Sequence, residues 1–221
     1  MESPIKPTEK SLEKKERRRL EKENEILKKV HAELLAQLIE KDKEASFDSL
    51  TDLMRRHPFE EEIKTYLDGF RDKESESEVA ELSLVFFDID HFGQFNKTWG
   101  EQVGDTVLKR VAEVIRQFTR GYDPTCRWGG EEMVLAMIGA DEEQALHKAK
   151  LIIYEISRLD FSDIDPRLKD LNVTTSAGVA SSRKFPEFES LLDAADEALR
   201  KSKTTGRNKV TAHSDILDKK I

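Results

Sequence analysis

Hydrophobic residues along the chain follow different periods in its N-terminal and remaining parts. From Ser11 to Glu44 there is neither proline nor glycine, and leucines recur close to a heptad spacing in a background rich in lysine, arginine and glutamate. This pattern predicts one long helix over that range. The stripe consists of Leu20, Leu27, Leu34 and Leu38, with Asn24 and His31 at the alternating seam positions and Ile26, Val30, Leu35 and Ile39 beside them.

The stripe favours a coiled coil of about four heptads, in which a second copy of the chain covers the seam and a buried Asn24 fixes the register. One solvated helix stays open as an alternative, because the charges along the segment alternate in sign. We therefore expect a flexible lead-in over residues 1–10 and a coiled-coil dimerisation helix over 11–46. A globular domain over 47–214 and a short tail over 215–221 would follow.

After residue 46 the pattern alternates between strands and helices. A short apolar run predicts a strand over 82–88, and we expect further strands over 173–182 and 209–212. A glycine pair between two expected strands predicts a hairpin over 125–138. Helical spacing predicts helices over 107–118, 141–159 and 188–203, and a helix over 47–71 that breaks near Pro58. The β-α-β-β-α-β order is typical of an α/β (α+β) fold with a ferredoxin-like sheet, and we expect helices on one face.

Composition narrows the class of protein. The 221 residues carry a formal net charge of -8, and 37% of them are charged, which fits one globular domain with a solvated helix. We expect no membrane insertion, because no apolar run is long enough to span a bilayer and the N-terminus lacks a secretory signal. The acidic balance argues against nucleic-acid binding. The single cysteine, Cys126, excludes an internal disulfide and agrees with a cytoplasmic location.

Carboxylates gather where a predicted buried strand ends. Asp88 and Asp90 stand at that end, where a carboxylate is costly unless a cation or hydrogen-bond donors compensate it. Glu131 and Glu132 follow the glycine pair, and because side chains alternate along a strand, one of the two can face Asp88. Carboxylate and carbonyl oxygens are the ligands that Mg²⁺ prefers. Taken alone, the residues also allow acids that simply lie on solvated loops.

Five ordered motifs span residues 48–210. They are DSLTDLMRRHPF (48–59), DIDHFGQFN (88–96) with GEQVGD (100–105), RWGGEEM (127–133), VTTSAGVA (173–180) and DEALRKSKTTGRNKV (196–210). Together they resemble the motifs of the GGDEF-domain diguanylate cyclases. The resemblance implies an enzyme that joins two GTP molecules into cyclic di-GMP and releases two pyrophosphates. It also implies a homodimer, because each domain binds one GTP and forms half of the active site.

The resemblance implies roles for the acidic residues. Asp88, Glu131 and the carbonyl of Ile89 would bind Mg²⁺, with Mn²⁺ as a substitute. Glu131 would also activate the attacking 3′-hydroxyl, and Glu132 would support the metal site or the hairpin.

It implies a nucleotide site as well. Asn96, Asp105 and Phe92 belong to the implied substrate-binding residues, and Asp105 favours GTP over ATP because adenine lacks the guanine N1–H and 2-amino donors. Lys203 and Arg207 would hold the terminal phosphates. Without the resemblance, the preferred explanation of the two basic residues is a helix end that suits the helix dipole.

An RxxD sequence, Arg120 to Asp123, stands upstream of Gly129 at the offset of the family's inhibitory site. The resemblance implies that cyclic di-GMP binds there as product and holds the catalytic domains apart. The alternative is a surface turn before Pro124 with an incidental ion pair.

The sequence departs from the family at five positions, of which Gly93 matters most because the family usually has a phosphate-binding lysine there. The others are Arg55, Glu101, Met133 and Arg200. None removes a metal carboxylate or a guanine contact, so we expect an active enzyme. The competing functions are a degenerate cyclase that serves as a cyclic di-GMP receptor, a cyclase of different nucleotide choice, and a scaffold that acts through its helix.

Overall fold

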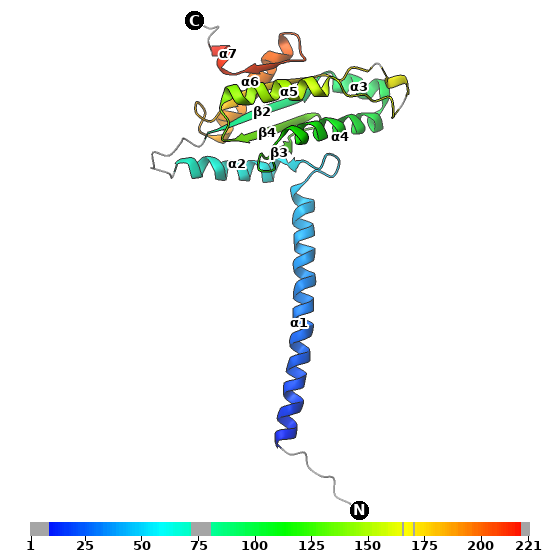
Figure 1. Cartoon of the computed structure of the whole chain (residues 1–221), viewed down its shortest axis with the longest axis vertical. Coiled ribbons are helices and arrows are strands. Elements are labelled where there is room, and N and C mark those ends of the chain that lie inside the picture. Colours follow the sequence, from blue (N-terminus) through cyan, green and yellow to red (C-terminus); the bar gives the residue numbers. More distant parts are fainter. Residues whose placement is uncertain (1–8, 72–80, 165, 170, 218–221) are drawn as a thin grey trace, which may run out of the picture. The chain divides into compact units, whose positions relative to one another are not determined.

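The computed structural model describes residues 9–71, 81–164, 166–169 and 171–217, and it divides the chain into two compact units, 1–45 and 46–221. The first unit is formed by helix α1 (Glu9–Ser46; Figure 1). Three leucines of the predicted stripe lie largely exposed in this single chain: Leu20, Leu27 and Leu34. The side chains of Leu38 and Ile39 lie outside the described residues, as do 1–8 of the expected lead-in and 218–221 of the expected tail.

The second unit is built on a six-stranded sheet in the order β1-β3-β4-β2-β5-β6. Its strands are β1 (Met54–Arg55), β2 (Leu82–Ile89), β3 (Thr125–Arg127), β4 (Glu132–Ile138), β5 (Thr175–Ser181) and β6 (Val210–Ala212). The central strand β2 is antiparallel to both β4 and β5. The order β3-β4-β2-β5 confirms the predicted ferredoxin-like sheet. Two edge strands extend it: β1 pairs in parallel with β3, and β6 pairs in parallel with β5.

Helices cover both faces of this sheet (Figure 1). They are α2 (Arg56–Arg71), α3 (Phe92–Trp99), α4 (Glu101–Phe118), α5 (Glu142–Ile156), α6 (Phe188–Thr204) and the short α7 (Ser214–Leu217), with a 3-10 turn at Pro166–Leu168. Val85 and Phe87 of β2 pack with α4 and α5, whereas Leu84 and Phe86 pack with α2 and α6. The expectation of helices on one face was therefore wrong. The continuous apolar run of β2 is the signature of a strand that is buried on both sides.

The predicted helix over 47–71 was also wrong in its first third. Residues 47–53 form a turn in which Asp52 has a φ of 57°, and β1 then pairs with β3 before α2 begins at Arg56. Pro58 does not break α2, because it lies in the first turn, where a backbone N–H has no helical partner. The separate helix α3 was not predicted; Gly100, with a φ of 86°, divides it from α4.

The contact between β5 and α6 sets the position of the helix that ends at the candidate site. A side-chain carbon on Gly178 would overlap the carbonyl oxygen of Ala195 and the backbone nitrogen of Leu199. The backbones of strand and helix therefore meet at this glycine, and any side chain would push α6 away from the sheet.

We expect Gly178→Ala to lower the free energy of unfolding by about 1–3 kcal/mol, because an added methyl group in a filled core forces the backbone to shift. Denaturant titration measures the change. Gly69→Ala is the matched control: nothing lies within 4 Å of a carbon added there, and alanine is the better helix former. Equal stability of the two variants would contradict the close packing at Gly178.

Candidate active site

A buried carboxylate and an amine meet at the end of β2. Asp88 is 6% exposed, and its Oδ2 lies 2.7 Å from the Nζ of Lys203, in the last turn of α6. Burial raises the pKa of Asp88, although Lys203 and the nearby charge of Arg207 act in the opposite direction. The sequence predicted Lys203 and Arg207 one turn apart at the end of the last helix. The structure brings Lys203 to Asp88, but α6 ends at Thr204, so Arg207 lies in the loop beyond it, near enough for its charge to act on Asp88. A carboxylate in this setting requires a cation beside it.

The hairpin between β3 and β4 brings the two glutamates to the same place. Glu132 is the cross-strand partner of Asp88, and the carbonyl of Glu131 accepts a hydrogen bond of 3.4 Å from the N–H of Ile89. Burial raises the pKa of Glu132, and the Asp88 carboxylate raises it further. The structure thus places Glu132 directly across from Asp88 and Glu131 next to Ile89. The assignment of Glu131 as the metal ligand stays a prediction.

The glycine pair of the hairpin does not form a tight two-residue turn. Strands β3 and β4 form the predicted hairpin, but four residues separate them, and neither Gly129 nor Gly130 has a positive φ. A side-chain carbon on Gly129 would lie 2.5 Å from Oε2 of Glu132. Gly129 therefore leaves room for the Glu132 carboxylate.

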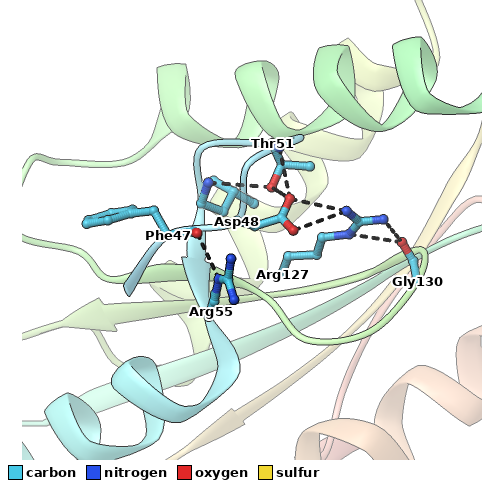
Figure 2. Close-up of polar contacts among 7 residues, drawn as sticks. Phe47, Asp48, Thr51, Arg55, Arg127 and Gly130 are labelled. Carbon is cyan, nitrogen blue, oxygen red and sulfur yellow. Dashed lines mark hydrogen bonds and ion pairs between the residues drawn. The ribbon is translucent and has the colours of Figure 1, made fainter. Parts of the chain in front are cut away.

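Arg127 ties the hairpin tip to the turn that follows α1 (Figure 2). Its Nε and Nη2 donate to the carbonyl oxygen of Gly130 at 3.2 and 2.9 Å, and its Nη1 donates to the two oxygens of Asp48 at 3.1 and 3.3 Å. The N–H and hydroxyl of Thr51 also donate to Asp48. Although burial opposes it, these donors hold the pKa of Asp48 below its ordinary value. The backbone beside Glu131 is thereby fixed from outside the hairpin.

We expect Arg127→Lys to increase amide hydrogen exchange over residues 128–131, because lysine cannot contact Asp48 and Gly130 together through a planar fork. Hydrogen exchange followed by mass spectrometry measures this change. Arg200→Lys is the control, since Arg200 makes an exposed ion pair with Asp196 on α6. Unchanged exchange at the hairpin tip in Arg127→Lys would contradict the anchoring role.

A polar atom without a partner marks the second part of the site. Oδ1 of Asn96 is buried and has no hydrogen-bond partner among the described residues. It lies so close over Gly104 that a side-chain carbon there would overlap it. The ring of Phe92, which is 5% exposed, also lies close to Gly104. Asp105, the next residue of α4, is exposed. An unpaired buried acceptor favours a ligand that brings a donor.

The RxxD segment lies at a hollow elsewhere on the same unit. Arg120 and Tyr122 are exposed, and Nη1 of Arg120 donates to the Tyr122 hydroxyl at 2.8 Å. The Asp123 carboxylate accepts from the N–H groups of Arg120 and Ile138 at 3.2 and 3.1 Å. The lining of a hollow of about 500 Å³ includes Arg120, Tyr122 and Asp123, together with Arg116. Arg116 was not among the residues predicted from the sequence, because no local motif connects it to this segment.

The donor set at β2 and the hairpin fits a hard divalent cation. Among the described residues no group of three or more His, Cys, Asp or Glu side chains gathers as a metal site. A cation at Asp88 would therefore take a second carboxylate from the hairpin, the carbonyl of Ile89, and oxygens supplied by a ligand or water. A nearby hollow of about 220 Å³ between α3 and residues 172–174 does not include Asn96 or Asp105 in its lining.

Comparison with known proteins gives one consistent family. The protein-family model described as "Diguanylate cyclase, GGDEF domain" matches residues 45–209. Diguanylate cyclase A of Treponema denticola is 33% identical over 173 residues, which cover 78% of this chain and 45% of that protein. Diguanylate cyclase DgcZ of Escherichia coli is 33% identical over 167 residues, 75% of this chain and 52% of that protein. The chain spans about half the length of these curated relatives.

A solved structure gives the same result. The coiled coil and GGDEF domain of DgcB from Caulobacter crescentus, in complex with c-di-GMP, superimposes with a TM-score of 0.79 at 29% identity and covers 87% of this chain and 98% of that chain. No helix among the residues placed in the present structure is long and apolar enough to cross a bilayer.

Proposed function

The chain belongs to the GGDEF family of diguanylate cyclase domains, and on that premise we propose that it condenses two GTP molecules into cyclic di-GMP and two pyrophosphates. The observation that carries the proposal is the buried Asp88 carboxylate, held 2.7 Å from Lys203 beside the hairpin glutamates. This arrangement combines a cation site with a basic group for phosphates. We also propose that the reaction takes place in the cytoplasm, as the single, buried and unpaired Cys126 suggests.

Asp88, Glu131 and the Ile89 carbonyl would hold Mg²⁺, and Mn²⁺ would replace it. The bound cation would neutralise charge that develops on the α-phosphate and on the leaving pyrophosphate. Glu131 would accept the proton of the attacking 3′-hydroxyl, and Lys203 and Arg207 would bind the terminal phosphates. Glu132 would support the metal site or the hairpin, because it lies directly across from Asp88 in the sheet.

The unpaired side-chain oxygen of Asn96 in α3 supports guanine recognition. The Asn96 oxygen would accept from a guanine donor, and the Asp105 carboxylate would accept from the N1–H and the 2-amino group. Phe92 would form the floor under Asn96, since it is buried there. ATP lacks the matching donors and would leave these acceptors unpaired.

A homodimer would bring two half-sites together. The exposed leucine stripe of α1 offers a seam that a second copy would cover, and a tether of this kind raises the local concentration of the linked domains to about the millimolar range. Each 3′-hydroxyl would then attack the α-phosphate of the opposite nucleotide.

Mass spectrometry of the products tests the proposal. Incubation with GTP and Mg²⁺ should give cyclic di-GMP, and incubation with ATP should give no cyclic dinucleotide. The absence of product at high protein concentration would contradict the cyclase. Binding of cyclic di-GMP without turnover would support the alternative of a receptor.

We further propose that cyclic di-GMP inhibits the enzyme through Arg120 and Asp123. Arg120→Ala should weaken inhibition by about tenfold or more, because a guanidinium group makes bidentate contacts with phosphate or with a guanine edge. Initial rates at increasing product concentration measure the effect. Arg158→Ala is a matched control, since Arg158 also lies over a tyrosine ring and donates to its hydroxyl. An unchanged inhibition constant in Arg120→Ala would exclude this site.

A further inference from the structure

Asp90 connects three segments that are far apart in the sequence. Its Oδ1 accepts from the hydroxyl of Ser176 at 2.7 Å. Its Oδ2 accepts from the hydroxyl of Thr174 at 2.7 Å and from the backbone N–H of Asn208 at 3.0 Å. The N–H of Asp90 itself donates to the carbonyl of Thr174 at 2.9 Å. The end of β2, the start of β5 and the loop after α6 are thus joined at one carboxylate.

The loop that Asp90 holds has an unusual backbone. Gly206, Arg207 and Asn208 have φ values of 119°, 60° and 48°. Arginine rarely adopts this left-handed region, and such a conformation persists when its surroundings fix it. Two backbone bonds do so here: the N–H of Arg207 donates to the carbonyl of Ser202 at 3.0 Å, and the N–H of Asn208 donates to Asp90.

The position of Asp90 relates this loop to the metal carboxylate. Asp90 stands two residues after Asp88, and Asn208 directly follows Arg207. Asp90 therefore follows the proposed cation ligand closely along the chain and, through Asn208, holds the backbone next to the proposed phosphate ligand.

We propose that Asp90 is a positioning residue that holds Arg207 where it meets the terminal phosphates of GTP. The inference rests on the proposed function, because it takes Arg207 as a phosphate ligand. Asp90 does not act as a metal ligand in this account: donors from Ser176, Thr174 and Asn208 engage both of its oxygens. Its effect on the nucleotide passes through the backbone of the loop.

The closing experiment measures binding of the α,β-methylene analogue of GTP, with Mg²⁺, to the full chain by isothermal titration calorimetry. In Asp90→Asn the amide replaces one acceptor by a donor, and we expect the affinity to fall about tenfold or more. Asp160→Asn is the matched control, because Asp160 also accepts from a backbone N–H and a serine hydroxyl, in a loop outside the site. We expect wild-type affinity for this control.

A double-mutant cycle separates positioning from a general structural effect. If Asp90 acts through Arg207, then Asp90→Asn combined with Arg207→Ala should bind no more weakly than Arg207→Ala alone. Additive losses would overturn the proposal, and so would wild-type affinity in Asp90→Asn. If the wild type itself fails to bind the analogue, the proposed function fails rather than this inference.

A second pair of variants serves if Asp90→Asn does not fold. Asn208→Val places a β-branched residue at a positive φ and should draw the N–H away from Asp90, whereas Asn208→Gly adopts that φ freely. We expect Asn208→Val to bind the analogue more weakly than Asn208→Gly. Equal affinities of the two would contradict the anchoring of the loop at Asp90.

Discussion

Asp88→Asn should abolish the formation of cyclic di-GMP and at the same time stabilise the metal-free protein. The loss of activity should reach about a thousandfold or more, because a catalytic cation contributes several kcal/mol of charge stabilisation and each 1.36 kcal/mol corresponds to about tenfold in rate. An amide of the same shape keeps the packing but gives the cation no negative ligand.

The gain in stability follows from the direction of the pKa shift. Burial raises the pKa of Asp88 above its ordinary value of 3.8, and Lys203 does not fully compensate. The folded protein therefore binds this proton more tightly than the unfolded chain does, and the ionised carboxylate costs stability above the folded pKa. The cost disappears as the pH falls through the folded pKa to below 3.8.

Denaturant titrations at two pH values test this reasoning. At pH 7 the free energy of unfolding should be higher for Asp88→Asn than for the wild type, and the difference should shrink near pH 4. Asp160→Asn is the control and should show no gain, because hydrogen bonds from Ser162 hold the pKa of Asp160 below its ordinary value. A wild type that is more stable than Asp88→Asn at pH 7 would show that the Lys203 ion pair outweighs burial.

Replacing two seam leucines by charge should make activity depend on protein concentration. In Leu27→Glu with Leu34→Glu, we expect the rate per chain at nanomolar concentration to fall by about a hundredfold, because the tether no longer keeps the two domains near millimolar effective concentration. The side chains of both leucines are more than half exposed in the single chain, so their loss should not disturb the folded unit.

The control for the seam places the same residue on the outer face of the helix. Lys22→Glu with Lys29→Glu changes exposed positions that do not belong to the leucine stripe. This variant should keep its activity and its dimer in sedimentation experiments. If the leucine variant retains full activity when dilute, the helix is not the tether.

The parts of the fold that the sequence predicted are those with strong local patterns. Strand β2 is a short apolar run, and α4, α5 and α6 repeat apolar residues at helical spacing, so each could be recognised within its own segment. Strand β1 has only two residues and exists because it pairs with β3, which lies 72 positions further along the chain at Met54 and Cys126. Such pairing leaves no local pattern. The placement of α2 and α6 on the second face of the sheet was not predicted, because the periodicity of a helix does not show which face of a sheet it covers.

The candidate active site likewise contains residues with a local sequence signal and residues that only the fold brings together. The hypothesis of a cation at Asp88, Glu131 and Glu132 came from acids at a strand end and a hairpin, together with the resemblance to the family. The bond between Arg127 and Asp48 joins residues 79 positions apart, and the bond between Asn208 and Asp90 joins residues 118 apart. From the sequence, Asp90 is a strand-end acid without a predicted role, because its three donors come from segments that only the fold brings together.

The position of the cation is the most direct test of the central claim. Crystals of the protein with Mn²⁺ and the α,β-methylene analogue of GTP should be measured at a wavelength where manganese scatters anomalously. We expect an anomalous peak within coordination distance of carboxylate oxygens of Asp88 and Glu131 and of the Ile89 carbonyl, with Lys203 moved to the phosphates. A peak bound by other residues, with Asp88 still paired to Lys203, would contradict the account.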